Sequence, residues 1–195
     1  HVLLPHIAGE QGINTIRSYN FDAEKGKLRP NNPDSYDQKD NRGPRHFVFH
    51  PNGKFVYFSN EQECSVTVYK YEEGRIEELQ TESTLPMHYS GVNTCAQIRI
   101  TGDGKFLYAP NRGHDSIACF SVNTSTGLLK SIGRTSTEPT PRVLDIDITG
   151  KYLYSAGLDS GYISAFSIGN KGKLSLIDRY EVGKEPMWVL VVPGE

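Results

Sequence analysis

The sequence predicts an all-β fold, a β-propeller built from four-stranded antiparallel blades. One pattern occurs three times: a tight turn, an apolar strand, a polar turn and a second alternating strand. The turn glycines of the three copies are Gly53, Gly104 and Gly150, so the repeat spans 51 and then 46 residues. Repeats of this length that contain only short strands and turns are typical of propeller blades.

The first complete copy shows how a blade is assembled. Its first two strands are rich in aromatic and β-branched residues, and they meet at Asn52-Gly53, a pair that favours a tight hairpin turn. Two more alternating strands follow across short polar turns. The predicted strands of the three copies are residues 45–50, 54–60, 66–71 and 76–84; residues 97–100, 105–111, 117–122 and 128–136; and residues 142–148, 151–157, 162–168 and 173–181.

Partial blades flank these copies. The segments 2–6, 16–21 and 27–30 match the second, third and fourth strands of a blade whose first strand is missing, and residues 187–192 match the first strand of another. One domain over residues 1–195 is therefore expected, with blades at approximately 1–44, 45–94, 95–140 and 141–185 and a further strand within 186–195. Propellers close with ~4–8 blades, because closure removes open sheet edges. With about three and a half blades, we expect remaining blades or a second chain to complete the ring.

Composition excludes several classes of partner. The formal net charge of −2 argues against nucleic acid or an anionic membrane as the main partner. No apolar run approaches the ~20 residues that span a bilayer. The three cysteines, Cys64, Cys95 and Cys119, lack a CxxC spacing and are interpreted as reduced thiols of a cytoplasmic protein. No cofactor or metal motif occurs, and we expect neither group.

Strand direction selects candidate site residues. In a propeller the first strand of each blade lines the channel, so its start and the end of the second strand share one face near the axis. The residues selected there include arginine, which binds anions in a bidentate manner, and Glu and His, which can transfer protons. We predict His6, Glu61 and Arg112 as catalytic, and Arg45, Asn60, Asn111, His114 and Arg142 as substrate-binding.

Structural roles remain open beside these. Arg45 and Arg142 could bond backbone carbonyls, Glu61 could serve only as an ion-pair partner, and His6 could be a packing residue. His46 is interpreted as pointing between blades and His50 as structural. The polar residues 31–42 are interpreted as a solvated connection between blades.

Four segments carry a family resemblance: VLLPH, GPRHFVFHPNGKFVYFSNE, NRGHDSI and TPRVLDIDITGKYLYSAG. Together they resemble the lactonase family of seven-bladed propellers, which includes the propeller type of 6-phosphogluconolactonase and a fungal 3-carboxy-cis,cis-muconate lactonizing enzyme. The resemblance implies an active site of His6, Arg45, Glu61 and Arg112. It also implies a ring about twice as long as this chain. Residues 95–98 depart from the family, in which an acidic residue is common there, and Leu158 offers no polar group at the rim.

The expected function is hydrolysis of a sugar lactone such as 6-phosphogluconolactone, by a carboxylic ester hydrolase. Two alternatives remain: a lactonizing isomerase that forms a muconolactone-type ring, and a non-catalytic propeller that serves as a binding platform. For either enzyme the expected partner is a small anionic lactone or carboxylate. Convergence of His6, Arg45, Glu61 and Arg112 on one mouth would favour an enzyme, because a scaffold does not need it.

Overall fold

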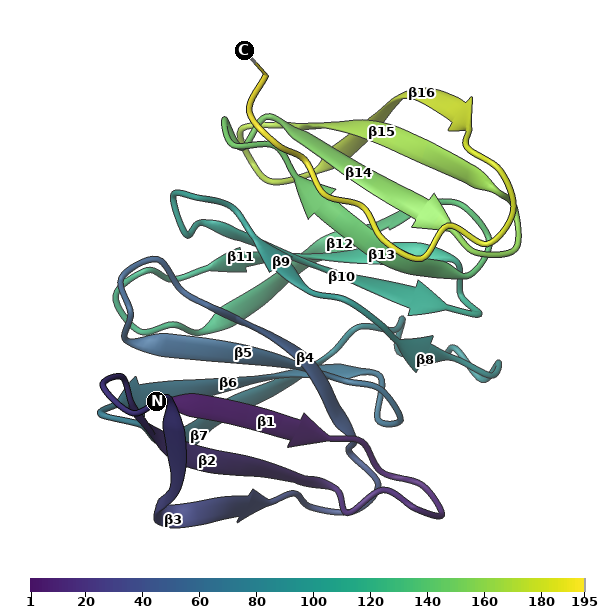
Figure 1. The fold of residues 1–195 in the computed structure, drawn as a ribbon. Coiled ribbons are helices and arrows are strands. Elements are labelled where there is room, and N and C mark those ends of the chain that lie inside the picture. The colour runs from purple at the N-terminus through teal and green to yellow at the C-terminus, as the bar shows by residue number, and fades with distance from the viewer. Residues whose placement is uncertain (195) are drawn as a thin grey trace.

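A computed structural model describes residues 1–194 as four antiparallel sheets that follow one another along the chain (Figure 1). No helix occurs within these residues, so the predicted all-β propeller architecture is confirmed. The sheets contain β1 (Val2–His6), β2 (Thr15–Asp22) and β3 (Lys27–Asp37); β4 (Pro44–Phe49), β5 (Phe55–Asn60), β6 (Ser65–Glu72) and β7 (Arg75–Ser83); β8 (Thr94–Cys95), β9 (Arg99–Ile100), β10 (Phe106–Arg112), β11 (Ser116–Val122) and β12 (Leu129–Ser136); and β13 (Pro141–Ile146), β14 (Tyr152–Gly157), β15 (Tyr162–Ile168) and β16 (Leu174–Glu181).

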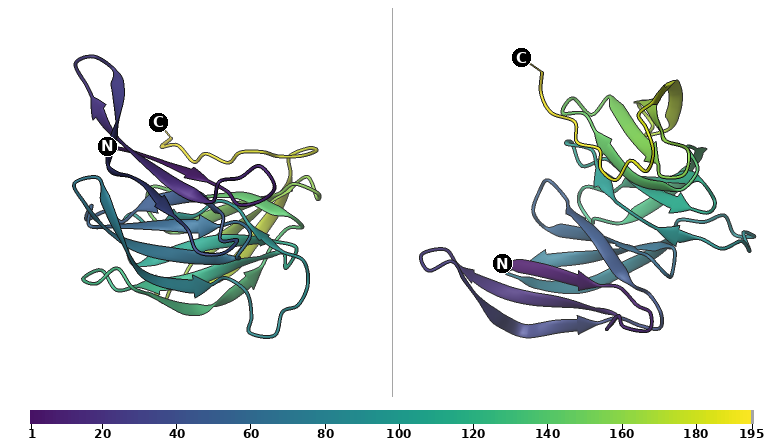
Figure 2. Two further views of the ribbon diagram at one scale, coloured as in Figure 1. Left: turned by 90° about the horizontal axis from the view of Figure 1, so that it is seen from below. Right: turned by 45° about the vertical axis from the view of Figure 1, so that its right-hand side comes forward.

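The sheets are stacked as successive blades, with the first and last at opposite ends of the stack (Figures 1 and 2). Within each sheet the strands pair in chain order, as in a meander. Apolar clusters lie between neighbouring blades, such as the one that joins Tyr57 and Val68 to Leu107 and Phe120. Successive strand residues face opposite sides of a sheet, so a blade covered on both sides buries every position. All six residues of β5 are accordingly buried.

A repeated contact holds neighbouring blades together. The Tyr57 hydroxyl donates to the Gly127 carbonyl oxygen at 3.0 Å, and the equivalent Tyr108 hydroxyl donates to the Gly172 carbonyl oxygen at 2.9 Å. Both glycines have positive φ. A Cβ atom on Gly127 would lie 2.5 Å from the Phe55 ring, so only glycine fits this close approach. The third and fourth blades thus each place an outer turn against the second strand of the preceding blade.

The last sheet leaves this contact unmade within residues 1–194. Tyr154 occupies the position equivalent to Tyr57 and Tyr108, and no glycine carbonyl among the described residues accepts its hydroxyl. Tyr152 nearby is 42% exposed. This surface is the one on which a following blade would pack, and completion of the ring by further blades or a second chain stays a prediction.

Three elements differ from the sequence prediction. Residues 187–192 form no strand, because a strand requires a paired neighbour and the described chain offers none; the Val191 amide instead donates to Asp145 Oδ2 at 2.9 Å. The inner strand of the third blade is broken into β8 and β9, and between them Gln97 Oε1 accepts the Leu144 amide of the next blade at 2.9 Å. In place of a solvated connection over residues 31–42, β3 continues to Asp37 and Arg42 is 5% exposed.

Candidate active site

Two of the predicted site arginines lie in β-bulges at the start of inner strands. The register of β4 with β5 shifts between Pro44 and His46, which leaves Arg45 as the extra residue. The register of β13 with β14 shifts in the same way between Pro141 and Val143, which leaves Arg142. A bulge bends the strand and re-aims one side chain. The repeated Pro-Arg sequence therefore turns an arginine out of the regular pleat in two blades.

The turn after β5 places Glu61 beside Arg45. The Glu61 amide donates to the Gly43 carbonyl oxygen at 2.7 Å, which fixes the turn against the segment that leads into β4. Gly43 has φ of +71°, and a Cβ atom there would overlap Gln62 Oε1. The same Gln62 oxygen accepts the Ala8 amide at 3.3 Å. This contact brings the loop that follows β1, and with it the end of the strand that carries His6, to the Glu61 turn.

Glu61 is held between two guanidinium groups. Arg45 Nε lies 3.2 Å from Glu61 Oε2, and Arg112 Nη2 donates to Glu61 Oε1. Arg112 Nη2 also donates to the Cys95 carbonyl oxygen at 2.7 Å. The three side chains are only 16%, 14% and 13% exposed for Arg45, Glu61 and Arg112. Two buried donors remain without a partner, Arg45 Nη1 and Arg112 Nε. Both N–H groups are closed off from solvent, so the cluster holds buried positive charge that is only partly satisfied by hydrogen bonds.

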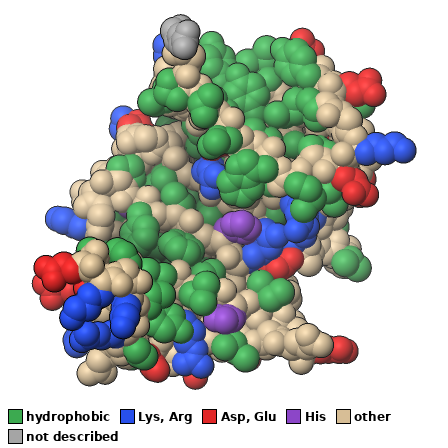
Figure 3. Space-filling model, viewed as in Figure 1, with side chains coloured by type: hydrophobic (Ala, Val, Ile, Leu, Met, Phe, Trp, Pro, Cys, Tyr) green, Lys and Arg blue, Asp and Glu red, His purple; other side chains and the backbone are tan. Residues whose placement is uncertain are grey.

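The surroundings of Glu61 carry an excess of positive charge. Burial lowers the pKa of Arg45, Glu61 opposes this, and the charges of Arg112 and Arg142 lower it further. Three arginines thus act near one carboxylate. Figure 3 shows basic, acidic and histidine side chains gathered near the middle of one face of the molecule.

His46 and Arg99 belong to the same electrostatic neighbourhood, and sequence reasoning missed both. Burial lowers the pKa of His46 to about 4, and the charges of Arg45, Arg99 and Arg142 act in the same direction. Arg99 in turn pairs with Asp145, its Nε 2.9 Å from Oδ1. The available signal for His46 was its place directly after the Pro-Arg bulge.

Two predicted substrate-binding residues do not reach the site. Asn60 and Asn111 are 0% exposed. The Asn60 amide donates to Ser65 Oγ at 2.7 Å and the Asn111 amide donates to the Thr84 carbonyl oxygen at 3.1 Å. These asparagines stabilise the turns that follow β5 and β10, and the substrate-binding assignment for them was wrong in this structure.

The two predicted histidines differ in how closely the structure ties them to Glu61. His6 ends β1 and is half-buried at the loop that Ala8 anchors to Gln62. His114, in the turn after β10, forms a hydrogen bond between its Nδ1 and Ser116 Oγ at 2.7 Å. Its ring packs edge-on against the Tyr89 ring, with the two ring centroids 4.8 Å apart. Within residues 1–194 no contact joins His114 to the Glu61 cluster. A role for either histidine stays a prediction.

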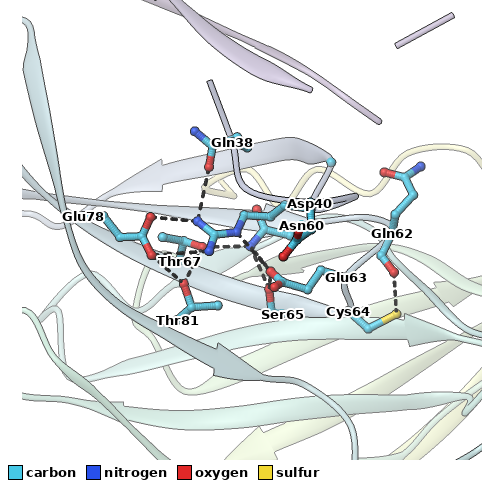
Figure 4. A network of polar contacts seen from close by, with 12 residues as sticks. Gln38, Asp40, Asn60, Gln62, Glu63, Cys64, Ser65, Thr67, Glu78 and Thr81 are labelled. Atoms are coloured by element: carbon cyan, nitrogen blue, oxygen red, sulfur yellow. Dashed lines mark hydrogen bonds and ion pairs between the residues drawn. The ribbon is translucent and has the colours of Figure 1, made fainter. Parts of the chain in front are cut away.

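A second buried ion-pair centre is built around the Arg42 guanidinium, and Figure 4 shows its partners Gln38, Glu63 and Glu78. Arg42 Nη1 donates to Glu78 Oε2 at 2.8 Å and Nη2 donates to Glu78 Oε1 at 3.3 Å. Its Nε lies 3.2 Å from Glu63 Oε2, and its Nη1 also donates to Gln38 Oε1 at 3.3 Å. The Tyr69 hydroxyl donates to the same Gln38 oxygen at 2.6 Å. The centre ties the connection after β3 to the outer strand β7.

Other parts of the described chain offer little that competes with this site. A cavity of about 820 Å³ lies between β3 and the β6–β7 hairpin, and none of the predicted site residues lines it. In the part of the chain that the structure describes, no group of three His, Cys, Asp or Glu side chains is arranged to hold a metal ion. A helix long and apolar enough to cross a membrane is likewise not found there.

Known proteins resemble this chain over most of its length. The family model described as lactonase, 7-bladed β-propeller, matches residues 7–191. A 6-phosphogluconolactonase of Serratia proteamaculans is 36% identical over 180 residues, which cover 91% of this chain and 54% of the relative. A 6-phosphogluconolactonase of Klebsiella pneumoniae is 41% identical over 172 residues, which cover 87% of this chain and 52% of the relative.

Solved structures also resemble this chain over most of its length. The periplasmic gluconolactonase of Pseudomonas aeruginosa superposes with a TM-score of 0.86 at 25% identity, covering 94% of this chain and 51% of that one. A Lactobacillus plantarum protein superposes with a TM-score of 0.85 at 28% identity, covering 96% of this chain and 57% of that one. The chain spans about half the length of the curated relatives that it matches. From the family model and these identities, this chain belongs to the lactonase family of seven-bladed β-propellers.

Proposed function

We propose that this chain carries the reaction centre of a lactone hydrolase that acts on a sugar lactone such as 6-phosphogluconolactone. The observation that carries the proposal is the Glu61 cluster, in which one carboxylate lies between Arg45 and Arg112 while a guanidinium N–H of each arginine has no partner. The names of the two curated relatives support the same reaction class.

In this proposal water attacks the carbonyl carbon of the lactone. Glu61 or His6 takes the water proton as the general base. The carbonyl oxygen becomes negatively charged and is stabilised by the positive charge of Arg112, which Glu61 and the Cys95 carbonyl oxygen hold in place. The ring C–O bond then breaks, and the ring oxygen takes a proton from the protonated base to become a hydroxyl.

The charge of the site supports an anionic substrate. Arg45, Arg112 and Arg142 supply three positive charges against the one negative charge of Glu61. The excess of two positive charges suits a phosphate or carboxylate group on the lactone, and guanidinium groups bind such groups in a bidentate manner. We propose that Arg142 and the free edge of Arg45 hold this group.

The Glu61→Gln variant tests the proposal. We expect turnover of 6-phosphogluconolactone by the purified protein to fall about 10²–10⁴-fold, as for loss of a general base. The matched control is Glu63→Gln, two residues further along, whose carboxylate faces Arg42 and not the site. A parallel His6→Gln variant shows which of the two groups is the base. Wild-type turnover in Glu61→Gln would exclude Glu61 as the base, and no turnover by the wild-type protein itself would favour the non-catalytic propeller.

Hydrolysis replaces lactonization as the preferred direction. Both curated relatives and the periplasmic structural relative are named as lactonases, and nothing in the site favours the isomerase alternative. We also propose that further blades or a second chain complete the ring, and that the protein is cytoplasmic, on the ground of its three free thiols. The Pseudomonas aeruginosa relative is described as periplasmic, so family membership alone does not assign the compartment.

A further inference from the structure

Two buried thiols adjoin the Glu61 cluster and have no role in the proposed hydrolysis. Cys64 lies in the turn after β5 and Cys95 lies in β8, so they belong to neighbouring blades. Both are free, at 6% and 0% exposed. Cys64 adopts φ of +56°, a conformation that is uncommon for residues other than glycine.

The two sulfur atoms share one polar cluster. Cys64 Sγ lies 3.2 Å from the carbonyl oxygen of Asn93 and 3.2 Å from its Nδ2. Cys95 Sγ lies 3.2 Å from Thr84 Oγ1 and 3.6 Å from Asn111 Oδ1. The same Thr84 hydroxyl donates to the Cys64 carbonyl oxygen at 2.8 Å, and Asn93 Nδ2 donates to Asn111 Oδ1 at 3.2 Å. Thr84, Asn93 and Asn111 therefore link the two cysteines into one hydrogen-bonded cluster.

The cluster divides the two thiols into different chemical roles. The neighbouring Cys95 thiol is the largest cause that lowers the pKa of Cys64, to about 6, and the Asn93 amide and the charge of Arg112 add to it. The Cys64 thiol, together with complete burial, raises the pKa of Cys95. Cys64 is then the nucleophile near neutral pH, and Cys95 is the protonated thiol beside it.

We propose that Cys64 and Cys95 form a redox pair that a peroxide converts into a disulfide between the second and third blades. The Cys64 thiolate attacks one oxygen of hydrogen peroxide, the O–O bond breaks and hydroxide leaves, so the sulfur becomes a sulfenic acid. The Cys95 sulfur then attacks the Cys64 sulfur, the S–S bond forms, and the S–O bond breaks. The leaving hydroxyl takes the Cys95 proton as water. In sum, two thiols and one peroxide give one disulfide and two waters.

The backbone of Cys95 connects this pair to the site. Its amide donates to the Glu61 carbonyl oxygen at 3.0 Å, and its carbonyl oxygen accepts Arg112 Nη2 at 2.7 Å. A disulfide needs its two Cβ atoms about 3.8 Å apart and a torsion near 90°, so its formation draws Cys95 toward Cys64. The Arg112 guanidinium moves with it, and we expect turnover to fall on oxidation. This last consequence rests on the lactonase function proposed above, whereas the thiol chemistry does not.

The test treats the reduced, purified protein with hydrogen peroxide at pH 7, blocks remaining thiols with iodoacetamide, and maps the peptides by mass spectrometry. We expect a Cys64–Cys95 cross-linked peptide about 2 Da lighter than the sum of its free parts, reversed by dithiothreitol. Cys119 is the internal control: it is 2% exposed, and burial raises its pKa to about 11. We expect it to be oxidised at least about tenfold more slowly than Cys64.

Variants separate the two steps. In Cys95→Ser the second step is blocked, so Cys64 should accumulate as a sulfenic acid that dimedone traps. Cys119→Ser should leave the disulfide yield unchanged. Oxidation of Cys119 as fast as Cys64, disulfides only between chains, or an unreacted Cys64 would each overturn the proposal. A disulfide that leaves turnover unchanged would refute only its coupling to Arg112. An inactive reduced protein that still forms the disulfide would refute the lactonase function alone.

Discussion

Two ion-pair centres lie on the same two segments of the chain, residues 42–45 and 61–63, and they are built in opposite ways. In the first, the single Arg42 faces two carboxylates, Glu63 and Glu78. In the second, the single Glu61 faces Arg45 and Arg112. The first centre carries an excess of one negative charge and the second an excess of one positive charge, before Arg142 is counted.

The surroundings of the two arginine sets explain the difference. Arg42 is bidentate to Glu78, its pKa is raised, and Gln38 occupies a further donor. At the other centre burial lowers the pKa of Arg45, and donors stay unpartnered. Both centres leave buried guanidinium donors without a hydrogen-bond partner, Arg42 Nε in the first and Arg45 Nη1 and Arg112 Nε in the second. The difference therefore lies in charge, because a cluster of like positive charges is costly unless an anion completes it. We therefore predict that the Arg42 centre contributes mainly to stability and the Glu61 centre mainly to binding.

Arg42→Met should produce the largest loss of stability. The substitution keeps much of the side-chain volume but leaves Glu78 and Glu63 facing each other without a cation. We expect the free energy of unfolding to fall by about 3 kcal/mol, as when one partner of a buried pair is removed. Urea denaturation measures this, and KM for the lactone should not change, because Arg42 does not face the site.

Glu63→Gln is the control for that measurement. Its carboxylate is 39% exposed, so its removal should cost less than about 1 kcal/mol. A loss for Arg42→Met as small as this would mean that solvent screens the Arg42 centre, and the contrast between the two centres would then fail.

Arg45→Met should have the opposite effect to Arg42→Met, with a large rise in KM and little change in stability. Arg112 still pairs with Glu61 in this variant, and the repulsion that Arg112 and Arg142 exert on Arg45 is removed. We expect the free energy of unfolding to change by less than about 1 kcal/mol, while KM rises about 10–100-fold because a bidentate anion contact is lost. Arg45→Lys should recover little of the binding, because an ammonium group cannot reproduce the planar fork. A large loss of stability with an unchanged KM would make Arg45 structural.

The sequence predicted the blades and the meeting of three charged side chains for clear physical reasons. Turn glycines at Gly53, Gly104 and Gly150 repeat because each starts the same hairpin with positive φ. Strand direction alone brought Arg45, Glu61 and Arg112 to one place, as the structure shows.

The remaining site features leave no periodic mark in the sequence. A β-bulge adds one residue, and a shift by one residue turns a side chain to the other face of the sheet. Asn60 and Glu61 are neighbours at the end of one strand, yet one is buried inside its blade and the other faces the arginines. Arg42 was assigned to solvent because its partner Glu78 lies on a strand 36 residues away.

Inorganic phosphate should distinguish the two centres by ligand linkage. A ligand that binds only the folded protein at ten times its Kd stabilises it by about 1.4 kcal/mol. We expect thermal unfolding of the wild-type protein to shift upward with phosphate, and the shift to persist in Glu63→Gln. It should disappear in Arg45→Met. Equal shifts in all three proteins would show that phosphate acts on the general surface, and the excess charge near Glu61 would not mark a binding site.

The smallest expected effect concerns His46 and pH. Its pKa of about 4, set first by burial and then by Arg45, Arg99 and Arg142 against Glu61, lies below its ordinary value of 6.5. The folded protein therefore binds this proton less readily than the unfolded chain. The stabilisation is complete above pH 6.5 and is lost as the pH falls toward 4.

The full pKa shift would correspond to about 3 kcal/mol, and because the ring is half-buried, solvent screening reduces this to about 1 kcal/mol. The unfolding free energy falls between pH 7 and pH 4.5, and His46→Gln should reduce this fall by about 1 kcal/mol, as measured by urea denaturation. Acidic groups that titrate in the same range contribute equally to both proteins. His88→Gln, at an exposed histidine, is the control and should follow the wild type. If His46→Gln also followed the wild type, the excess of positive charge would not extend from Arg45 to His46, and the binding centre would be confined to Glu61 and its two arginines.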